Sequence, residues 1–466
     1  MSTGPDASAR MRDPDYLPPL HQAIPLGIQH VLAMFVANVT PAVIVAGAAG
    51  FGHGAEAADR TAMVYLIQMS MLFAGVATLL QTVGFGPVGA RLPIVQGTSF
   101  AFVPVMVPIV AGQGVDAMAV IAGGVLAGGL FHALLAPFVG RLRFALPPLV
   151  TGLVVLMIGL SLVRVGIQYA AGGTAAMGTP AYGNATSWAI ALCVVLVTLA
   201  VKFLARGMWS VAAVLIGILA GYGLALMLGR VSFAPLDTAA AFALPRPFAF
   251  GITFQAAAVL GFCMMAVVSA VETVGDVSGV AKAGAGRAAT DDELRGATWA
   301  NGIGSALAGA FGALPNTSFS QNVGLIALTG LMSRHVVSIG ALFLILCGLV
   351  PVIGATVSTL PIEVLGGGVI VMFGMVCASG ISILSDVRWN RRNMLILAVS
   401  LSVGLGLQQE PAALQHLPET AQVLLATGLL PAAFIAITLN LALPDPPSAG
   451  GEGPGAHHPE NAPGLQ

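Results

Sequence analysis

The feature that most constrains this chain is a series of long apolar runs, each long enough to form a helix across a lipid bilayer. A hydrocarbon core of about 30 Å requires roughly 20 apolar residues per helix. Hydrophobic residues make up 57% of the 466 positions and charged residues only 8%, whereas soluble domains carry about 25% charged residues. Too few charges remain to cover a surface that faces water. We therefore predict an all-α, polytopic membrane protein.

The runs predict fourteen transmembrane spans in two sets of seven. The first seven cover residues 25–50, 61–85, 92–112, 116–140, 145–168, 187–204 and 207–229. The second seven cover residues 253–276, 296–313, 317–332, 335–357, 361–384, 393–408 and 420–443. Residues 1–24 and 444–466 are rich in Pro, Gly and charge, and we predict disordered cytoplasmic tails there.

Lysine and arginine divide unevenly between the two sides of this predicted topology. With the N-terminus in the cytoplasm, four basic residues fall on the outer side: Arg60, Arg164, Arg230 and Arg246. The remaining fourteen of the 18 fall on the cytoplasmic side, and such an excess is the rule for membrane proteins. We predict a multi-pass protein of the plasma (cytoplasmic) membrane with both termini in the cytoplasm. The net charge of −1 provides no field that would attract nucleic acid.

Two short patterns recur in the two sets of spans. The third span contains Gly97-Thr98-Ser99-Phe100, and the tenth contains Asn316-Thr317-Ser318-Phe319. The fifth and twelfth spans both open with Leu-Pro, at positions 146–147 and 360–361. Both matches place span n opposite span n + 7, which indicates a repeat of seven helices. Because seven is odd, the second repeat is predicted to enter the membrane inverted relative to the first.

The predicted repeats cover residues 25–229 and 253–443, and their interrupted helices should meet near the middle of the bilayer. The two Thr-Ser-Phe segments are the predicted interruptions. We expect short strands and half-helices in spans 3 and 10, because each segment follows a helix-disfavouring residue, Pro93 or Pro315. A half-helix N-terminus would present free backbone N–H groups to a polar ligand. An ordinary kink in a packed helix is the alternative.

Few ionisable side chains interrupt the apolar runs, and each is costly at membrane depth. Glu272 and Asp276 are four residues apart and therefore share one face of span 8. Like charges at this spacing disfavour joint ionisation, so one of the pair could carry a proton. Their alternative role is to brace a neighbouring helix. Lys202 is expected to snorkel to the cytoplasmic interface, and Glu363 to be solvated at the outer end of span 12.

Span 10 adds a carboxamide, Gln321, to these carboxylates. A carboxamide donates and accepts hydrogen bonds, as does the edge of a lactam-bearing heterocycle. Glu272 could accept from ring N–H groups, while Phe100 and Phe319 could face the ring plane. This set suits a flat, neutral or weakly acidic heterocycle. It suits an inorganic anion poorly, because no Arg or Lys is expected near the middle of the spans.

The segment Gln321-Asn322-x-Gly324-x₄-Thr329-Gly330 resembles the signature of the nucleobase–ascorbate transporter family (nucleobase:cation symporters). Gln29-His30, the Thr-Ser-Phe segment of span 3 and the Glu272–Asp276 segment extend the resemblance over the whole transmembrane chain. It implies a homodimer that works by an elevator-like cycle. It also implies a core domain from spans 1–4 (25–140) and 8–11 (253–357), and a gate domain from spans 5–7 (145–229) and 12–14 (361–443).

The resemblance also implies roles for individual residues. The implied substrate-binding residues are Glu272 and Gln321 through side chains, Phe100 and Ser320 through the backbone, Phe319 by stacking, and Ser99 by shaping the site. The implied polar and coupling network consists of Glu272, Asp276, His30, Asn322 and Asn301. His30 has the alternative of a purely interhelical hydrogen bond. Many relatives carry Asp at the position of Asn301, which cannot titrate, so coupling is expected to depend on the other members.

Gln321 at the first signature position resembles carriers of oxidised purines, which implies import of xanthine, uric acid or both. The coupling ion is expected to be a proton rather than sodium, with no other cofactor. The main alternative is a uracil or pyrimidine permease of the same fold. An anion exchanger or channel is the further alternative. We predict no enzymatic activity, because the sequence shows no metal-ligand cluster, nucleophile–base arrangement or phosphate loop.

Overall fold

The computed structural model describes residues 10–51, 57–142, 147–237 and 239–444. The predicted C-terminal tail lies almost entirely outside these residues, as do the first nine residues of the predicted N-terminal tail. From residue 10 onwards, the prediction of a disordered N-terminal tail is wrong. Met332 N donates to Met11 O at 2.7 Å and Arg334 N donates to Pro14 O at 2.9 Å, so this segment binds the loop before α15.

The described elements are mainly helices, with one short strand in each half. The first half contains α2 (Leu20–Ala49), α3 (Ala57–Thr82), β1 (Gln96–Thr98), α4 (Val103–Val110), α5 (Met118–Leu135), α6 (Val139–Leu142), α7 (Pro148–Ala170), α8 (Ala185–Leu204), α9 (Met208–Val211), α10 (Ala213–Met227) and α11 (Ala234–Asp237). The second half contains α12 (Ala256–Val280), α13 (Asp291–Ala310), β2 (Asn316–Ser318), α14 (Ser320–Thr329), α15 (Arg334–Leu349), α16 (Pro351–Ser358), α17 (Ile362–Ser385), α18 (Arg391–Gln409), α19 (Glu419–Ala426) and α20 (Leu429–Ala442). A π-helical turn, Ala281–Ala285, extends α12.

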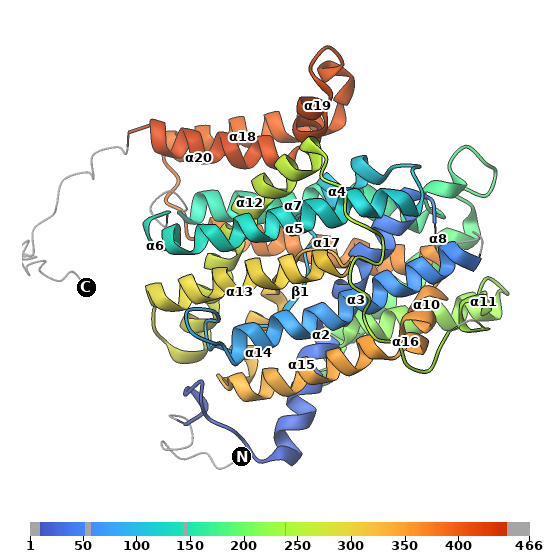
Figure 1. The fold of residues 1–466 in the computed structure, drawn as a ribbon, viewed down its shortest axis with the longest axis horizontal. Coiled ribbons are helices and arrows are strands. Elements are labelled where there is room, and N and C mark those ends of the chain that lie inside the picture. The colour runs from blue at the N-terminus through green and yellow to red at the C-terminus, as the bar shows by residue number, and fades with distance from the viewer. Residues whose placement is uncertain (1–9, 52–56, 143–146, 238, 445–466) are drawn as a thin grey trace, which may run out of the picture.

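The long helices lie side by side, and the two short strands occupy the middle of the bundle (Figure 1). One group of contacts joins α5 to α12 and α13, and α15 to α2 and α3. A second group joins α7 to α17 and α20, α17 to α8 and α10, and α18 to α20. The largest hydrophobic cluster extends through both groups, from α2 residues such as Met34 to α17 residues such as Phe373.

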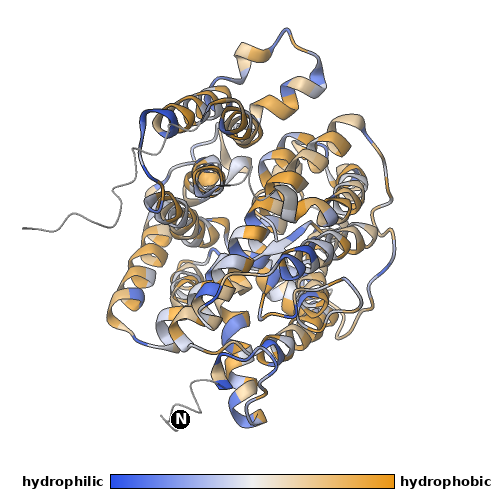
Figure 2. Ribbon diagram, turned by 90° about the vertical axis from the view of Figure 1, so that its left-hand side faces the viewer, coloured by the Kyte–Doolittle hydropathy of each residue, from blue (hydrophilic) through white to orange (hydrophobic). Residues whose placement is uncertain are grey.

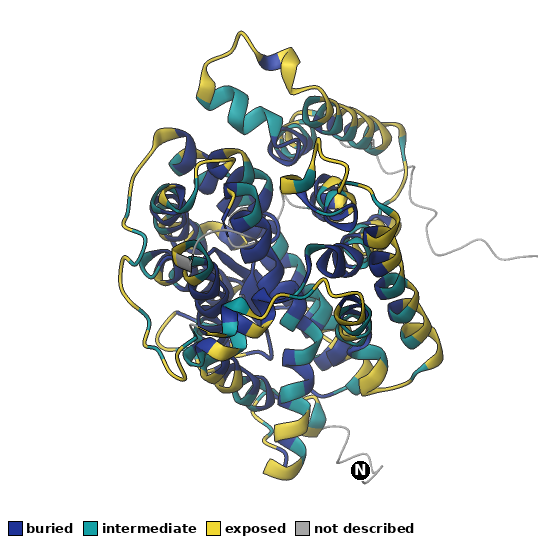
Figure 3. Cartoon of the chain, turned by 90° about the vertical axis from the view of Figure 1, so that its right-hand side faces the viewer, coloured by how far each residue is buried: buried dark blue, intermediate teal, exposed yellow. Residues whose placement is uncertain are grey.

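Many large apolar side chains lie on the outward faces of the helices, which suits contact with lipid. Apolar residues dominate the outer helices (Figure 2), although many of these positions are exposed (Figure 3). Phe203 is 82% exposed and Leu204 is 83% exposed. Among the described residues, seven helices are long and apolar enough to cross a membrane alone, and two bent helix pairs would each do so together. The chain is therefore a multi-pass membrane protein.

Two spans predicted as single helices are broken. The span predicted at 335–357 consists of α15 and α16, which meet at an angle of 80°. Pro351 begins α16, and a proline there removes a backbone donor and disfavours helical geometry in the residue before it. The span predicted at 420–443 consists of α19 and α20 at 81°. Gly428 between them has φ of +69°, a conformation that favours glycine.

Spans 3 and 10 are interrupted, as predicted from the Thr-Ser-Phe segments. In each, a three-residue strand precedes a short helix, and β1 and β2 pair antiparallel with Gly97 opposite Thr317. Residue 97 must be glycine because side chains of neighbouring elements lie close to its Cα. A Cβ at this position would lie 2.5 Å from Phe319 Cε2 and 2.9 Å from Asn38 Oδ1.

Candidate functional site

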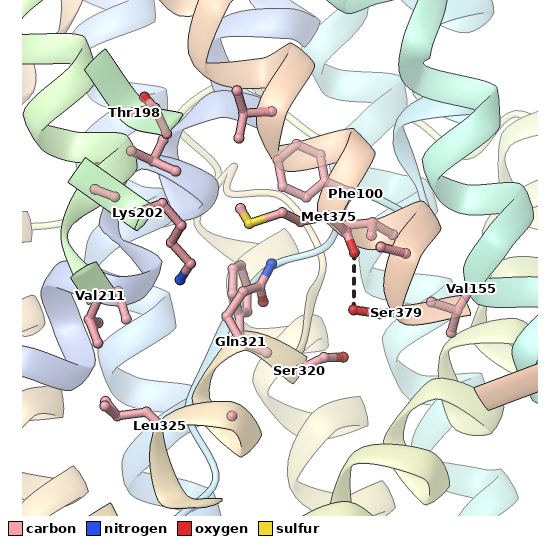
Figure 4. A pocket seen from close by; sticks show the side chains of 18 of the residues that line it. Phe100, Val155, Thr198, Lys202, Val211, Ser320, Gln321, Leu325, Met375 and Ser379 are labelled. Carbon is pink, nitrogen blue, oxygen red and sulfur yellow. Dashed lines mark hydrogen bonds between the residues drawn. The ribbon is translucent and has the colours of Figure 1, made fainter. Parts of the chain in front are cut away.

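A cavity of about 800 Å³ lies where the two strands meet α8, α12, α14 and α17. Its wall is mainly apolar, with polar side chains concentrated on the strand side: Thr98, Glu272, Thr317, Ser318, Ser320 and Gln321. Figure 4 shows Gln321 and Phe100 projecting into this space from opposite sides. The wall also includes exposed Phe203 and Leu328 at the C-terminal ends of α8 and α14, so the cavity opens at that end of the molecule.

The two carboxylates of α12 occupy different environments although they share a helix face. Glu272 lines the cavity, and its Oε2 accepts from Thr317 Oγ1 at 3.0 Å. Asp276 is 8% exposed; its two oxygens accept from Ser318 Oγ at 2.5 Å and from Ser320 Oγ at 2.6 Å. Glu272 therefore faces the cavity, while Asp276 holds the junction between β2 and α14.

The residues after β2 place amide and aromatic groups against the cavity. We call β1 with α4 the first crossing and β2 with α14 the second crossing. Phe319 N donates to Val95 O at 3.0 Å, so the pairing of the two segments continues up to the start of α14. Gln321 follows in the first turn of α14 and lines the cavity, as do Phe319 and Ser320. The N-terminus of a half-helix therefore faces the same space as the Gln321 carboxamide.

The first crossing is anchored by a buried asparagine. Asn38 of α2 is fully buried, and its Oδ1 accepts from Thr98 N at 2.8 Å and from Thr98 Oγ1 at 3.2 Å. Phe100 lines the cavity and packs edge-on against Phe373 of α17, with 5.2 Å between ring centroids. Ser99 is fully buried. The structure does not place it on the cavity wall within the described residues, and its hydroxyl has no hydrogen-bond partner there.

The remaining members of the predicted network lie behind the cavity wall. Asn322 Nδ2 contacts His30 Nδ1 at 3.0 Å and donates to His30 O at 3.2 Å. This interhelical pair joins α14 to α2 and corresponds to the alternative considered for His30. Neither residue is among the described residues that line the cavity.

Asn301 is fully buried on α13 and reaches Glu272 only through hydroxyl groups. Its Nδ2 donates to Thr273 Oγ1 at 2.8 Å and to Ser269 Oγ at 3.5 Å. Ser269 Oγ in turn donates to Thr317 Oγ1 at 3.3 Å, and Thr317 donates to Glu272. One chain of hydrogen-bonding groups therefore connects α13, α12 and β2 to the carboxylate on the cavity wall.

Comparison with known proteins identifies the family. The profile of a permease family, Xan_ur_permease, matches residues 21–413. This chain belongs to the nucleobase–ascorbate transporter family. It is 36% identical to the uric acid transporter UacT of Escherichia coli K12, over 89% of this chain and 85% of that protein. It is also 36% identical to the xanthine permease XanP of the same organism, over 92% and 93% of the two chains.

A third relative and two solved structures place this nucleobase–ascorbate transporter in context. The uric acid permease PucJ of Bacillus subtilis is 36% identical over 89% of this chain and 91% of its own. The transmembrane domain of the cyanobacterial bicarbonate transporter BicA has a TM-score of 0.57 at 14% identity, over 91% and 99% of the chains. SLC26A9 has a TM-score of 0.57 at 15% identity, over 83% of this chain and 63% of its own. These two likenesses show a shared membrane-transporter fold.

The predicted family is thus confirmed, and the protein is a transporter and not an enzyme. The structure corrects the prediction for one charged residue of this nucleobase–ascorbate transporter, Glu363, and adds to the prediction for another, Lys202. Lys202 was expected near the cytoplasmic end of its span, and it is an exposed residue in the last turn of α8 that also lines the cavity with Gln321. Glu363 was expected to be solvated, but it is 4% exposed; it accepts from Arg230 Nη2 at 2.9 Å and from Ser187 Oγ at 3.1 Å.

Asn38 was not singled out from the sequence, and Thr317 was named only as part of a Thr-Ser-Phe segment, although both position the site. The available signal was weak: Asn38 is one of two amide side chains in the first apolar span, with Gln29, and follows His30 by eight residues. A buried amide usually has hydrogen-bond partners, but only the folded chain shows that the partner is Thr98.

Proposed function

We propose that this transporter imports an oxidised purine, xanthine and/or uric acid, together with a cation. The observation that carries the proposal is the presence of Glu272 and Gln321 on the wall of one cavity, where two interrupted helices meet. Relatives named as xanthine and uric acid permeases, each 36% identical over most of the chain, support the substrate class.

The chemistry of the wall fits the edge and the face of such a heterocycle. Glu272 Oε2 is held by Thr317, which leaves Oε1 to accept from a ring N–H group. The Gln321 carboxamide matches a lactam edge, because it donates and accepts side by side. Phe100 and Phe319 offer aromatic surface close to both groups.

We propose fourteen spans arranged as two inverted repeats, and the helix contacts support this symmetry. A shift by seven spans exchanges α2 with α12, α3 with α13, α5 with α15, α7 with α17, α8 with α18 and α10 with α20. Under that exchange, the contact of α3 with α15 becomes the contact of α13 with α5, and both occur. The contacts of α7 with α20 and α17 with α10 correspond in the same way.

The two contact groups support a core domain that moves against a gate domain in an elevator-like cycle. Glu272 and Gln321 lie on α12 and α14, in the group that forms the proposed core. The opposite wall comes from α8 and α17, in the proposed gate. The excess of basic residues supports cytoplasmic termini in the plasma membrane, and family membership supports a homodimer.

A proton is the proposed coupling ion. None of the ion pairs among the described residues includes Glu272 or Asp276. A buried, unpaired carboxylate is costly in a membrane, and binding a proton with the substrate removes that cost. With Asn301 in place of a titratable side chain, Glu272 and Asp276 are the proposed proton carriers, and His30 with Asn322 braces them.

Uptake of labelled xanthine, urate and uracil tests this function in a host that lacks its own permeases. We expect xanthine or urate to accumulate, an ionophore that collapses the proton gradient to prevent accumulation, and uracil not to compete. Removal of sodium should have no effect. Competition by uracil alone would instead establish the pyrimidine alternative.

Anion exchange is the second candidate, and it is favoured by two observations: Lys202 on the cavity wall and the fold shared with a bicarbonate transporter. It predicts flux of bicarbonate or chloride that purines do not inhibit. The absence of such flux in proteoliposomes that take up purines would exclude it.

A further inference from the structure

Lys202 is a charged side chain on the cavity wall, and the proposed purine transport assigns it no role. It lies in the last turn of α8, and in Figure 4 its ammonium group extends into the same space as the Gln321 carboxamide. Among the hydrogen bonds of the described residues, its ammonium group makes one, a long contact of 3.4 Å with Ser210 O. An ammonium group has three protons, so donors remain for a ligand.

Lys202 and Glu272 are the charged side chains among the described residues that line the cavity. They lie on opposite groups of helices, Lys202 on α8 and Glu272 on α12. Glu272 suits a neutral N–H donor but would repel an anion. Lys202 is an exposed side chain at the open end of the cavity, and a cation there attracts an anion and offsets this repulsion.

The two purines of the proposed function differ in charge. Uric acid is ionised at neutral and mildly acidic pH, whereas xanthine is neutral at mildly acidic pH. We propose that Lys202 is a specificity-determining residue that binds the anionic form of the substrate and thereby favours urate over a neutral purine. This inference rests on the proposed function, because it assumes that purines enter the cavity.

The position of Lys202 predicts on which side of the membrane the preference for urate acts. The cavity opens beside the C-terminal ends of α8 and α14, near Phe203 and Leu328. The excess of basic residues places this end in the cytoplasm. α8 packs against α10 and α17, whereas Gln321 lies on α14, which packs against α12 and α2. Movement of one group against the other would carry the substrate away from Lys202, so the contact belongs to the cytoplasm-facing state.

Urate and xanthine affinities measured separately on each membrane face test the proposal. Lys202→Gln removes the charge, Lys202→Arg keeps it, and Lys282→Gln is a matched control, because Lys282 is exposed and does not line the cavity. In inverted membrane vesicles at mildly acidic pH, we expect Lys202→Gln to raise the KM for urate about fivefold. The KM for xanthine, and the urate KM in right-side-out vesicles, should remain unchanged. Lys202→Arg should restore the urate KM, and Lys282→Gln should match the unaltered protein.

Three results would overturn the inference. Lys202→Gln could leave the cytoplasmic urate KM unchanged, could raise the urate and xanthine values equally, or could act equally on both faces. The first would show that the charge is not used, the second that its effect is steric, and the third that it does not belong to one state. Failure of the unaltered protein to take up either purine would instead reject the proposed function, and this inference with it.

Discussion

The two crossings at the centre of this transporter occupy corresponding places in the two halves, yet they differ in chemistry. After Ser99 the chain reads Phe100-Ala101-Phe102, whereas after Ser318 it reads Phe319-Ser320-Gln321. The serines before these segments differ as well. Ser318 donates to Asp276 at 2.5 Å, whereas Ser99 is fully buried with no hydrogen-bond partner among the described residues.

This difference indicates that the two crossings have different roles. The first crossing, β1 and α4, supports the site: Asn38 fixes Thr98, Gly97 permits close packing, and Phe100 provides apolar surface. The second crossing, β2 and α14, carries the polar groups that face the cavity. Substitutions in the first should therefore alter stability, and substitutions around the second should alter transport.

The largest effect is expected from substitution of Glu272, whose carboxylate accepts a hydrogen bond from Thr317 of the second crossing. Glu272→Gln should reduce kcat/KM for purine uptake about 100-fold, because a hydrogen bond to a charged group contributes about 1.5–3 kcal/mol. It should also abolish proton-driven accumulation. Initial uptake rates with and without an ionophore measure both effects. Glu419→Gln, on an exposed residue of α19, is the control, and normal pH-driven uptake by Glu272→Gln would exclude Glu272 as the coupling residue.

Gly97→Ala tests whether the first crossing is structural. The added methyl would meet Phe319 and Asn38, so we expect the free energy of unfolding to fall by about 2 kcal/mol. Gly324→Ala is the matched control in the second crossing, where a Cβ meets no atom within 4 Å. Thermal unfolding of the purified protein in detergent compares the two. Equal midpoints for both variants would show that the crossing does not need this glycine.

Gln321→Glu tests recognition by the second crossing. The change replaces an amide donor with an acceptor, so the match to a lactam edge is lost. We expect the preference for xanthine or urate over uracil to fall about tenfold, in line with the loss of one hydrogen bond. Competition of each compound with labelled xanthine measures the ratio. Unchanged selectivity would remove Gln321 from the recognition set.

The smallest expected effect is at Asn301, which contacts the second crossing only indirectly. Asn301→Asp replaces the donor to Thr273 with a titratable group, so the pH profile of uptake should change. The maximum rate should fall less than about fivefold. Rates measured across a pH series, with Asn301→Gln as a non-titrating control, give the answer. Identical profiles for Asn301→Asp and the unaltered protein would show that this position does not affect the pH dependence of transport.

Much of the fold was predictable from local patterns. The helix interruptions in spans 3 and 10 were predicted because proline, glycine and polar residues are all unfavourable in a continuous apolar helix. The bends before α16 and within the last span were missed, although Pro351 and Gly428 mark them. Proline and glycine also occur inside unbroken membrane helices, such as α2 with Pro25 and Pro41, so their presence alone does not locate a bend.

The candidate site was predictable only in part. Glu272, Gln321, Phe100, Phe319 and Ser320 were named from the sequence and do share one cavity. The division of roles between Glu272 and Asp276 was not predictable, because it depends on which hydroxyl groups of the second crossing lie opposite each carboxylate. The burial of Glu363 was missed because its partners, Arg230 and Ser187, are remote in the chain.

By itself, the sequence determined that the chain spans a membrane many times and where two of its helices break, because hydrophobicity and helix propensity act over short stretches. Only the tertiary structure decided that the two breaks pair as strands, that Asp276 lies behind the cavity wall, and that Lys202 lines the cavity. These features depend on contacts between residues tens to hundreds of positions apart. The physical reason is that an ionisable group acquires its role from its neighbours in space.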